Sequence, residues 1–235
     1  MKLRDRLIQN IQRLAISAGH PIGVSQFVLQ SWKLTGSAIP NGYDETVFRS
    51  PPVGAQRDVD ILFAGRITKD KGVFDLLHAV GCVSFQNRAL KLVFAGAGES
   101  LHELKQLCKA LPHDTEVIFS GSLASHEVAA WMRRSKVLVL PTTKFWIETS
   151  GLVLLEALAS GCRIVGTDNG GISENCSGFG HIVPMDNPVA LRHAIDIELR
   201  RVGHPTPHLE RFLAGRTWPE VATRYIDIMS EFANN

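Results

Sequence analysis

The feature that most constrains the fold is a regular alternation of short apolar runs with helical segments, which extends from Val59 to Arg200. Continuous apolar runs of strand length are typical of parallel strands that are buried on both faces. The helical segments between them supply the crossover connections that parallel strands require. We therefore predict an α/β fold, a Rossmann-like doubly wound parallel sheet, with strands at Ile61–Ala64, Lys91–Ala95, Val117–Ser120, Val137–Leu140, Arg163–Gly166 and His181–Val183.

Signals for helix ends place helices between these strands. Ser125 is expected to cap the start of one helix, and Gly161 follows the end of another. A short polar side chain is favoured at the first position, and glycine is favoured just after the last turn. Helices are predicted near Val73–Val83, Leu101–Leu111, His126–Arg134, Gly151–Ser160 and Pro188–Arg200, with a final helix that opens at Thr217-Trp218-Pro219-Glu220.

The beginning of the chain does not follow this pattern. It contains a helical stretch, a short run at Ile22–Ser25, a helix around Phe27–Leu34 and a turn at Ile39–Gly42, which together cannot bury a core of their own. Pro51 and Pro52 then indicate a linker. The predicted divisions are a partial N-terminal segment at residues 1–50, the linker at 51–57, the main domain at 58–216 and the C-terminal helix at 217–235.

Charge, cysteine content and hydrophobicity limit the classes of protein to which this chain can belong. The 25 basic and 23 acidic residues nearly balance, so no strong field favours nucleic acid. Cys82, Cys108, Cys162 and Cys176 form no CxxC pair and are interpreted as reduced thiols. No run could span a bilayer, and the first residues lack the apolar core of a signal peptide. We predict a cytoplasmic protein with at most peripheral contact between a Met1–Leu14 helix and the inner membrane surface.

Ligands of open parallel sheets bind beyond the carboxyl ends of the strands. The first predicted strand is followed there by Arg66 and, shortly after, by Lys71. A guanidinium and an ammonium beside a helix start can hold phosphate oxygens. Two solvated loop cations are the alternative interpretation of this segment.

A second segment, Glu148–Gly161, follows the strand at Val137–Leu140 and opens a helix. Gly151 allows close approach of the backbone to a ligand, and the free amides of the first helical turn favour a diphosphate. Glu148 can accept hydrogen bonds from sugar hydroxyls, and Glu156 can accept both hydroxyls of a ribose. Because the neighbours of Glu156 are apolar, a carboxylate at that position is expected to have a partner.

These segments resemble a known family, the retaining glycosyltransferases of the two-domain GT-B architecture and the family 4 type. Its signature is two glutamates separated by seven residues, as in Glu148 and Glu156. The resemblance covers roughly residues 22–232. The further matching motifs occur in the family's order: Ile39-Pro40-Asn41-Gly42, Gly65-Arg66 with Lys71-Gly72, Gly96-Ala97-Gly98, and Gly170-Gly171-Ile172-Ser173-Glu174.

The resemblance implies a role for each matching residue. Arg66 and Lys71 would hold the pyrophosphate of a UDP-sugar or GDP-sugar donor, Glu148 the transferred sugar and Glu156 the ribose. Anomeric configuration would be retained without a metal or other cofactor. Ser150 stands where the family often has an aromatic residue, so it bears on the identity of the donor sugar. The remaining donor-binding residues are expected to be Gly65, Gly151 and Leu152, with Gly121 to Leu123 at the edge of the base.

A complete GT-B enzyme also has an N-terminal acceptor domain, of which residues 1–50 resemble only the last strand and helix. We therefore expect a donor-binding subunit or fragment that needs a partner protein, or self-association, to complete the acceptor site. A nucleotide-sugar-binding module without catalysis and another GT-B enzyme, such as an epimerase or phosphorylase, are the alternatives.

Other motifs have weaker interpretations. Gly96-Ala97-Gly98 lacks the third glycine of a dinucleotide fingerprint. Asp58-Val59-Asp60 resembles a metal-binding DxD motif but precedes its strand, and is interpreted as a solvated start of that strand. The histidines show no metal-ligand spacing. Trp146, beside Glu148, is interpreted as packing at the rim of the site, with an acceptor or partner contact as the alternative.

Overall fold

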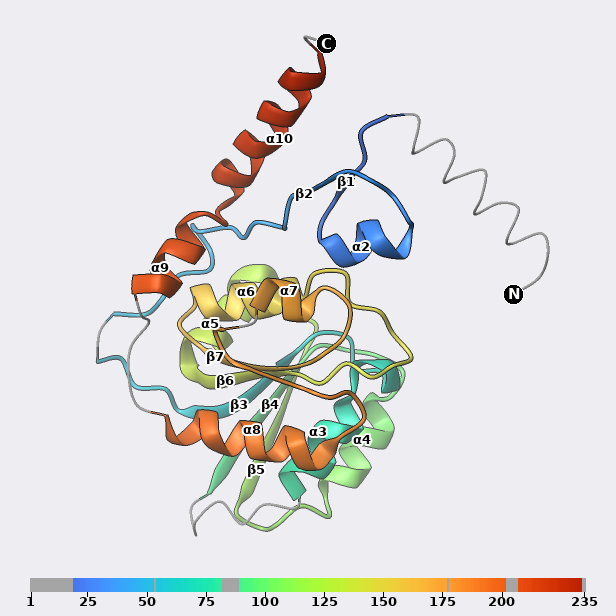
Figure 1. Ribbon diagram of the computed structural model, residues 1–235. Coiled ribbons are helices and arrows are strands. Elements are labelled where there is room, and N and C mark those ends of the chain that lie inside the picture. Colours follow the sequence, from blue (N-terminus) through green and yellow to red (C-terminus); the bar gives the residue numbers. More distant parts are fainter. Residues whose placement is uncertain (1–18, 53, 82–88, 177, 202–206, 234–235) are drawn as a thin grey trace, which may run out of the picture.

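The computed structural model describes residues 19–52, 54–81, 89–176, 178–201 and 207–233. Its centre is a six-stranded parallel sheet of order β5-β4-β3-β6-β7-β8 (Figure 1). The chain thus starts in the middle, winds to one edge and then winds to the other, which is the predicted doubly wound, Rossmann-like arrangement. The strands are β3 (Val59–Ala64), β4 (Leu90–Ala95), β5 (Thr115–Gly121), β6 (Ser135–Leu140), β7 (Arg163–Thr167) and β8 (His181–Val183).

Helices cover both faces of the sheet and enclose two hydrophobic clusters. In β3 every residue is buried: Leu62 belongs to one cluster, whereas Ile61 and Phe63 belong to the other. Successive strand residues point to opposite faces, so a strand covered on both sides is apolar almost throughout. One face is covered by α5 (Ser125–Arg134), α6 (Leu152–Ala159) and α7 (Ile172–Cys176), and the other by α3 (Val73–Gly81), α4 (Leu101–Cys108) and α8 (Pro188–Arg200).

The N-terminal segment and the start of α10 meet outside the sheet. The backbone N–H of Trp218 donates to the carbonyl of Tyr43 at 3.1 Å. Figure 1 shows α10 projecting away from the sheet, and Ile226 and Met229 on it are exposed. None of the described helices is long and apolar enough to cross a membrane. The elements outside the sheet are β1 (Ile22–Gly23) paired in parallel with β2 (Ser37–Ala38), then α2 (Gln26–Ser31), α9 (Pro207–Ala214) and α10 (Trp218–Ala233).

The six predicted strands and the predicted helices are confirmed, with differences at the ends. The predicted cap Ser125 is wrong: Ala124 holds the cap position, and its N–H donates to Glu127 at 2.8 Å. The helix expected to reach Leu111 ends at Cys108. The helices α7 and α9 were not predicted; the five residues of α7 are too few for a clear period. The predicted Met1–Leu14 helix and Cys82 lie outside the described residues.

The predicted linker at residues 51–57 ends in a fixed arginine. Arg57 donates through Nη1 to the carbonyls of Met132 at 3.0 Å and Ser135 at 2.6 Å, and through Nη2 to that of Ser160 at 3.0 Å. Charge-assisted hydrogen bonds to three carbonyls hold the chain rigidly where it enters β3. The divisions between segments themselves stay a prediction.

Candidate functional site

The loops after β3, β6 and β7 meet at the carboxyl edge of the sheet. Close packing of these loops depends on Gly72, which has a φ of 72°. A methyl group at this position would overlap the carbonyl oxygen of Pro141, at the end of β6. The loop after β3 also bonds to the loop after β6, because the N–H of Thr143 donates to the carbonyl of Asp70 at 3.0 Å. The predicted site residues of these two loops are therefore brought together.

Two of them, Lys71 and Glu148, contact each other directly. The ammonium of Lys71 donates to Oε1 of Glu148, and the hydroxyl of Thr142 donates to the same oxygen at 3.0 Å. Only 13% of the Lys71 side chain and 14% of the Glu148 side chain are exposed. Removing one member of such a pair would leave a nearly buried charge without its partner.

Arg66 lies beside this pair and is more exposed. Its Nη2 is 3.2 Å from Oδ2 of Asp70. Its guanidinium carbon lies 4.5 Å from the centre of the Trp146 ring, and the Lys71 ammonium lies 5.0 Å from the same centre. The predicted phosphate-binding cations thus converge on one aromatic ring. Trp146 thus contacts both predicted cations, and its ring does more than pack beside Glu148.

Asn169 holds the loop that carries Glu148 and was not identified from the sequence. Its Oδ1 accepts from the N–H of Glu148 at 2.9 Å, and its Nδ2 donates to the carbonyls of Thr143 and Trp146 at 2.9 and 2.7 Å. Asn169 is 4% exposed. Its position just after β7 is the signal that could have identified it, because this is where an open sheet collects functional side chains.

A hollow of about 460 Å³ lies next to these loops. The predicted residues Gly65, Arg66, Leu123, Leu152 and Glu156 line it. Lys71 and Glu148 are not among its lining residues, whereas Arg66 lines the hollow and shares the Trp146 ring with Lys71. The remaining lining is mainly small or apolar: Ala64, Ala95, Gly96, Ala97, Ser122, Val128 and Val153.

Glu156 is the ionisable carboxyl of this hollow. Burial raises its pKa from 4.5 to about 7. No described residue donates a hydrogen bond to its side chain, so the expected partner of this carboxyl is not in the described part of the chain. A largely buried carboxyl without a protein partner is costly to ionise, and such groups concentrate at functional sites.

The other predicted donor-binding residues lie around the start of α6. Gly151 is the residue before the helix and has a φ of 66°. Ser150 is buried, and its carbonyl accepts from Nδ2 of Asn175 at 3.4 Å. Gly121, at the end of β5, precedes Leu123 and is not among the residues that line the hollow.

The N-terminal segment contacts the loop that carries Glu148 and also contacts α7. The hydroxyl of Ser25 donates to the carbonyl of Thr149 at 2.8 Å, one residue after Glu148. The carboxylate of Glu174 accepts from the N–H groups of Gln26 and Phe27 at 2.7 and 3.1 Å, at the start of α2. The predicted Gly-Gly-Ile-Ser-Glu motif therefore anchors α2 through its glutamate.

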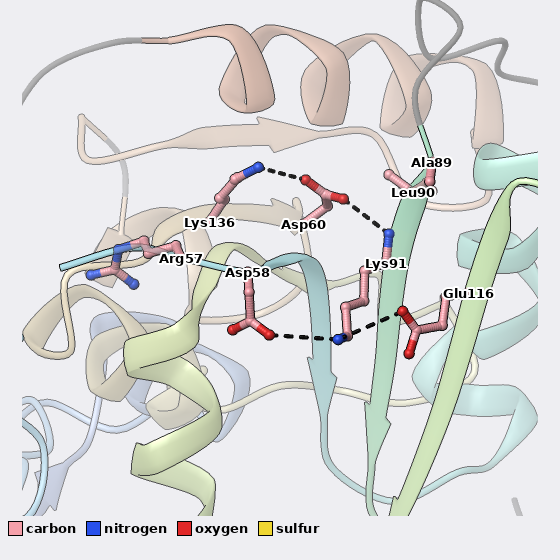
Figure 2. A pocket seen from close by; sticks show the side chains of 8 residues that line it. All are labelled: Arg57, Asp58, Asp60, Ala89, Leu90, Lys91, Glu116 and Lys136. Carbon is pink, nitrogen blue, oxygen red and sulfur yellow. Dashed lines mark hydrogen bonds and ion pairs between the residues drawn. The ribbon is translucent and has the colours of Figure 1, made fainter.

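A second hollow, of about 320 Å³, lies at the amino edge of the sheet (Figure 2). Asp60 accepts there from Nζ of Lys136 at 2.8 Å and from the N–H of Lys91 at 2.9 Å, and it is 3% exposed. The interpretation of Asp60 as solvated is therefore wrong, because its place within β3 buries it. Asp58 is more exposed, and the hydrogen bonds from Arg134 lower its pKa to about 2.

These charges pair with one another. Lys91 bridges Asp58 and Glu116 at 3.5 and 3.6 Å, as Figure 2 shows. No group of three or more His, Cys, Asp or Glu side chains within the described ranges could hold a metal ion. The amino edge is therefore a network of ion pairs, while the residues predicted to bind ligand gather at the opposite edge.

Comparisons with known proteins show which family this chain belongs to. Residues 46–200 match the family model described as glycosyl transferases group 1. An uncharacterized glycosyltransferase of Methanocaldococcus jannaschii is 32% identical over 133 residues, which are 56% of this chain and 33% of that protein. The alpha-monoglucosyldiacylglycerol synthase of Streptococcus pneumoniae is 28% identical over 150 residues, 58% of this chain and 33% of the synthase.

Solved structures share the fold at low identity. HepE of Anabaena, in complex with UDP and glucose, superposes with a TM-score of 0.76 at 17% identity, covering 97% of this chain and 67% of HepE. Sucrose-phosphate synthase of Thermosynechococcus elongatus gives a TM-score of 0.74 at 22% identity, covering 97% of this chain and 62% of the synthase. The match to the first two relatives spans about a third of their length. Since the family model covers well over half of the chain, this protein belongs to the glycosyl transferases group 1 family.

Proposed function

We propose that this chain is the donor-binding half of a retaining GT-B glycosyltransferase of the family 4 type, which transfers a sugar from a UDP-sugar or a GDP-sugar. The observation that carries the proposal is the convergence of Arg66, Lys71 and Glu148 beside a hollow that ends at Glu156. These residues come from three separate loops and helices, and each suits one part of a nucleotide sugar.

Each contact follows from the chemistry of the ligand. A ribose presents two neighbouring hydroxyls, and the unpaired carboxylate of Glu156 can accept both. The diphosphate would lie between the hollow and the pair, where Arg66 and Lys71 provide positive charge. Glu148 would accept hydrogen bonds from the hydroxyls of the transferred sugar. As the bond to the diphosphate breaks, preorganised cations stabilise the growing negative charge without a metal ion.

Binding of a donor would change two ion pairs of the predicted cations. Lys71 pairs with Glu148, and Arg66 pairs with Asp70. Diphosphate oxygens would replace both carboxylates as partners of the cations, and Glu148 would then turn to the sugar. Pairs of this kind keep the cations compensated until a stronger anion arrives.

The acceptor site is proposed to come from a second polypeptide or from further sequence of a longer protein. HepE, which resembles this chain in fold, is half again as long. Exposed apolar residues on α10, such as Ile226 and Met229, provide surface for such a contact. Self-association is the alternative, and the number of chains per particle in solution distinguishes the two.

The test is calorimetric titration of the chain with UDP, GDP and their sugar conjugates. Glu156→Ala and Lys71→Ala should abolish or strongly weaken binding, whereas Glu116→Ala, at the amino edge, should leave it unchanged. Absence of binding to every nucleotide by the folded wild-type chain would refute the proposal. Binding without sugar transfer, after an acceptor-domain protein is added, would favour the non-catalytic binding module instead.

A further inference from the structure

The ring of Trp146 contacts two cations from the loop after β3. Arg66 follows β3 directly, whereas Lys71 ends the short 3-10 turn Lys69–Lys71. Their charged groups nevertheless lie 4.5 and 5.0 Å from the same ring centre. The electron-rich face of an indole attracts cations, and it does so more strongly than the face of any other side chain.

The backbone of Trp146 is held in place by two hydrogen bonds. The carbonyl of Trp146 accepts from Nδ2 of Asn169 at 2.7 Å, and its N–H donates to the carbonyl of Thr143 at 3.3 Å. Trp146 nevertheless remains 43% exposed, although a large apolar side chain gains from burial. Because its backbone is fixed and its side chain is partly exposed, Trp146 can provide a contact surface for other side chains.

The ring contact differs in kind from the carboxylate contacts of the same cations. Asp70 and Glu148 compete with a diphosphate, because they offer the same kind of negative oxygen. The indole carries no net charge, so an anion can bind the outer side of each cation while the ring stays in contact. The ring can therefore hold Arg66 and Lys71 together both before and after an anion arrives.

We propose that Trp146 is a positioning residue for diphosphate binding, which keeps Arg66 and Lys71 converged on one anion. This proposal rests on the proposed function, since it takes the diphosphate of a nucleotide as the anion. It adds to the predicted site a residue that touches the cations and need not touch the ligand.

Binding of UDP and UMP should be compared in Trp146→Leu, Trp146→Phe and the matched control Phe145→Leu. Phe145 is the adjacent aromatic residue and is 79% exposed. Trp146→Leu should weaken UDP binding roughly five- to thirtyfold, as expected for the loss of two cation–π contacts. The same substitution should weaken the binding of UMP less, because UMP has one phosphate fewer. Trp146→Phe, which keeps an aromatic face, should retain most of the wild-type affinity. Phe145→Leu should change the affinity for neither UDP nor UMP. If guanine nucleotides bind more tightly, GDP and GMP replace UDP and UMP.

A measurement without nucleotide separates this proposal from the proposed function. The Nε–Hε resonance of Arg66, assigned with Arg66→Lys, should be shifted by the ring current in the wild type and in Trp146→Phe. It should move to the position of a solvated arginine in Trp146→Leu. A resonance that is the same in all variants would refute the ring contact, and equal losses of UDP and UMP affinity would refute the link to the diphosphate. If the folded wild type binds no nucleotide but keeps the shifted resonance, the proposed function fails, and the assignment to a diphosphate fails with it.

Discussion

Replacing Glu156 by glutamine should stabilise the chain while removing nucleotide binding. Burial raises the pKa of Glu156 from 4.5 to about 7, so the folded chain binds this proton more tightly than the unfolded chain does. Between these two pH values the folded state holds more protons, and the free energy of unfolding therefore falls as the pH rises. The destabilisation by Glu156 reaches its full size above about pH 7, where the carboxyl is ionised in both the folded and the unfolded state.

The size of the effect follows from the two pKa values. One pKa unit corresponds to about 1.4 kcal/mol, so a rise from 4.5 to about 7 corresponds to at most about 3 kcal/mol. Water that enters the open hollow reduces this figure, and we expect Glu156→Gln to raise the free energy of unfolding by about 1–3 kcal/mol at pH 8. At pH 4 the wild-type carboxyl is protonated in both states, and the variant should gain little.

Urea unfolding of wild type and variant between pH 4 and pH 8 measures this difference. The exposed Glu210 on α9 provides the matched control, since Glu210→Gln should change the free energy of unfolding little and equally at all pH values. A difference between Glu156→Gln and wild type that does not grow with pH would refute the argument from burial. A variant that is less stable than wild type at pH 8 would show that Glu156 has a partner within the protein.

Three further predictions concern the same region. UDP or GDP affinity should rise as the pH increases from 6 to 8, because ribose hydroxyls donate to the ionised form of Glu156. Titration calorimetry in buffers of different ionisation enthalpy should show that binding releases a proton. An affinity that is constant over this pH range would contradict the prediction. Asn169→Ala removes three hydrogen bonds from the loop that carries Glu148 and should cost about 1–3 kcal/mol in urea unfolding. Its loss of nucleotide binding should exceed that of the control Glu116→Ala, which lies at the amino edge of the sheet. Glu174→Ala should speed hydrogen exchange at the Gln26 and Phe27 amides and cost about 1 kcal/mol, whereas unchanged exchange would show that the cap does not form in solution.

The fold could be predicted because its signals are local. The burial of β3 on both faces appears in the sequence as an unbroken apolar run, and the helix Pro188–Arg200 is marked at its start by Asn187 and Pro188. Short elements such as α7, with five residues, carry too few positions for a period to be recognised. Asp60 was misinterpreted because a polar residue at the start of an apolar run is normally solvated, whereas here Lys136 and the backbone of Lys91 satisfy it.

By itself, the sequence determined the α/β class, the six strands and the set of residues that follow those strands. These properties depend on the period of apolar residues and on motifs within a few positions of one another. Only the tertiary structure decided which of these residues touch: Lys71 with Glu148 across 77 positions of sequence, Trp146 beneath Arg66, and Asn169 behind the loop of Glu148. The physical reason is that side-chain partners at a sheet edge are set by strand order and loop packing, which bring together segments that local patterns cannot relate.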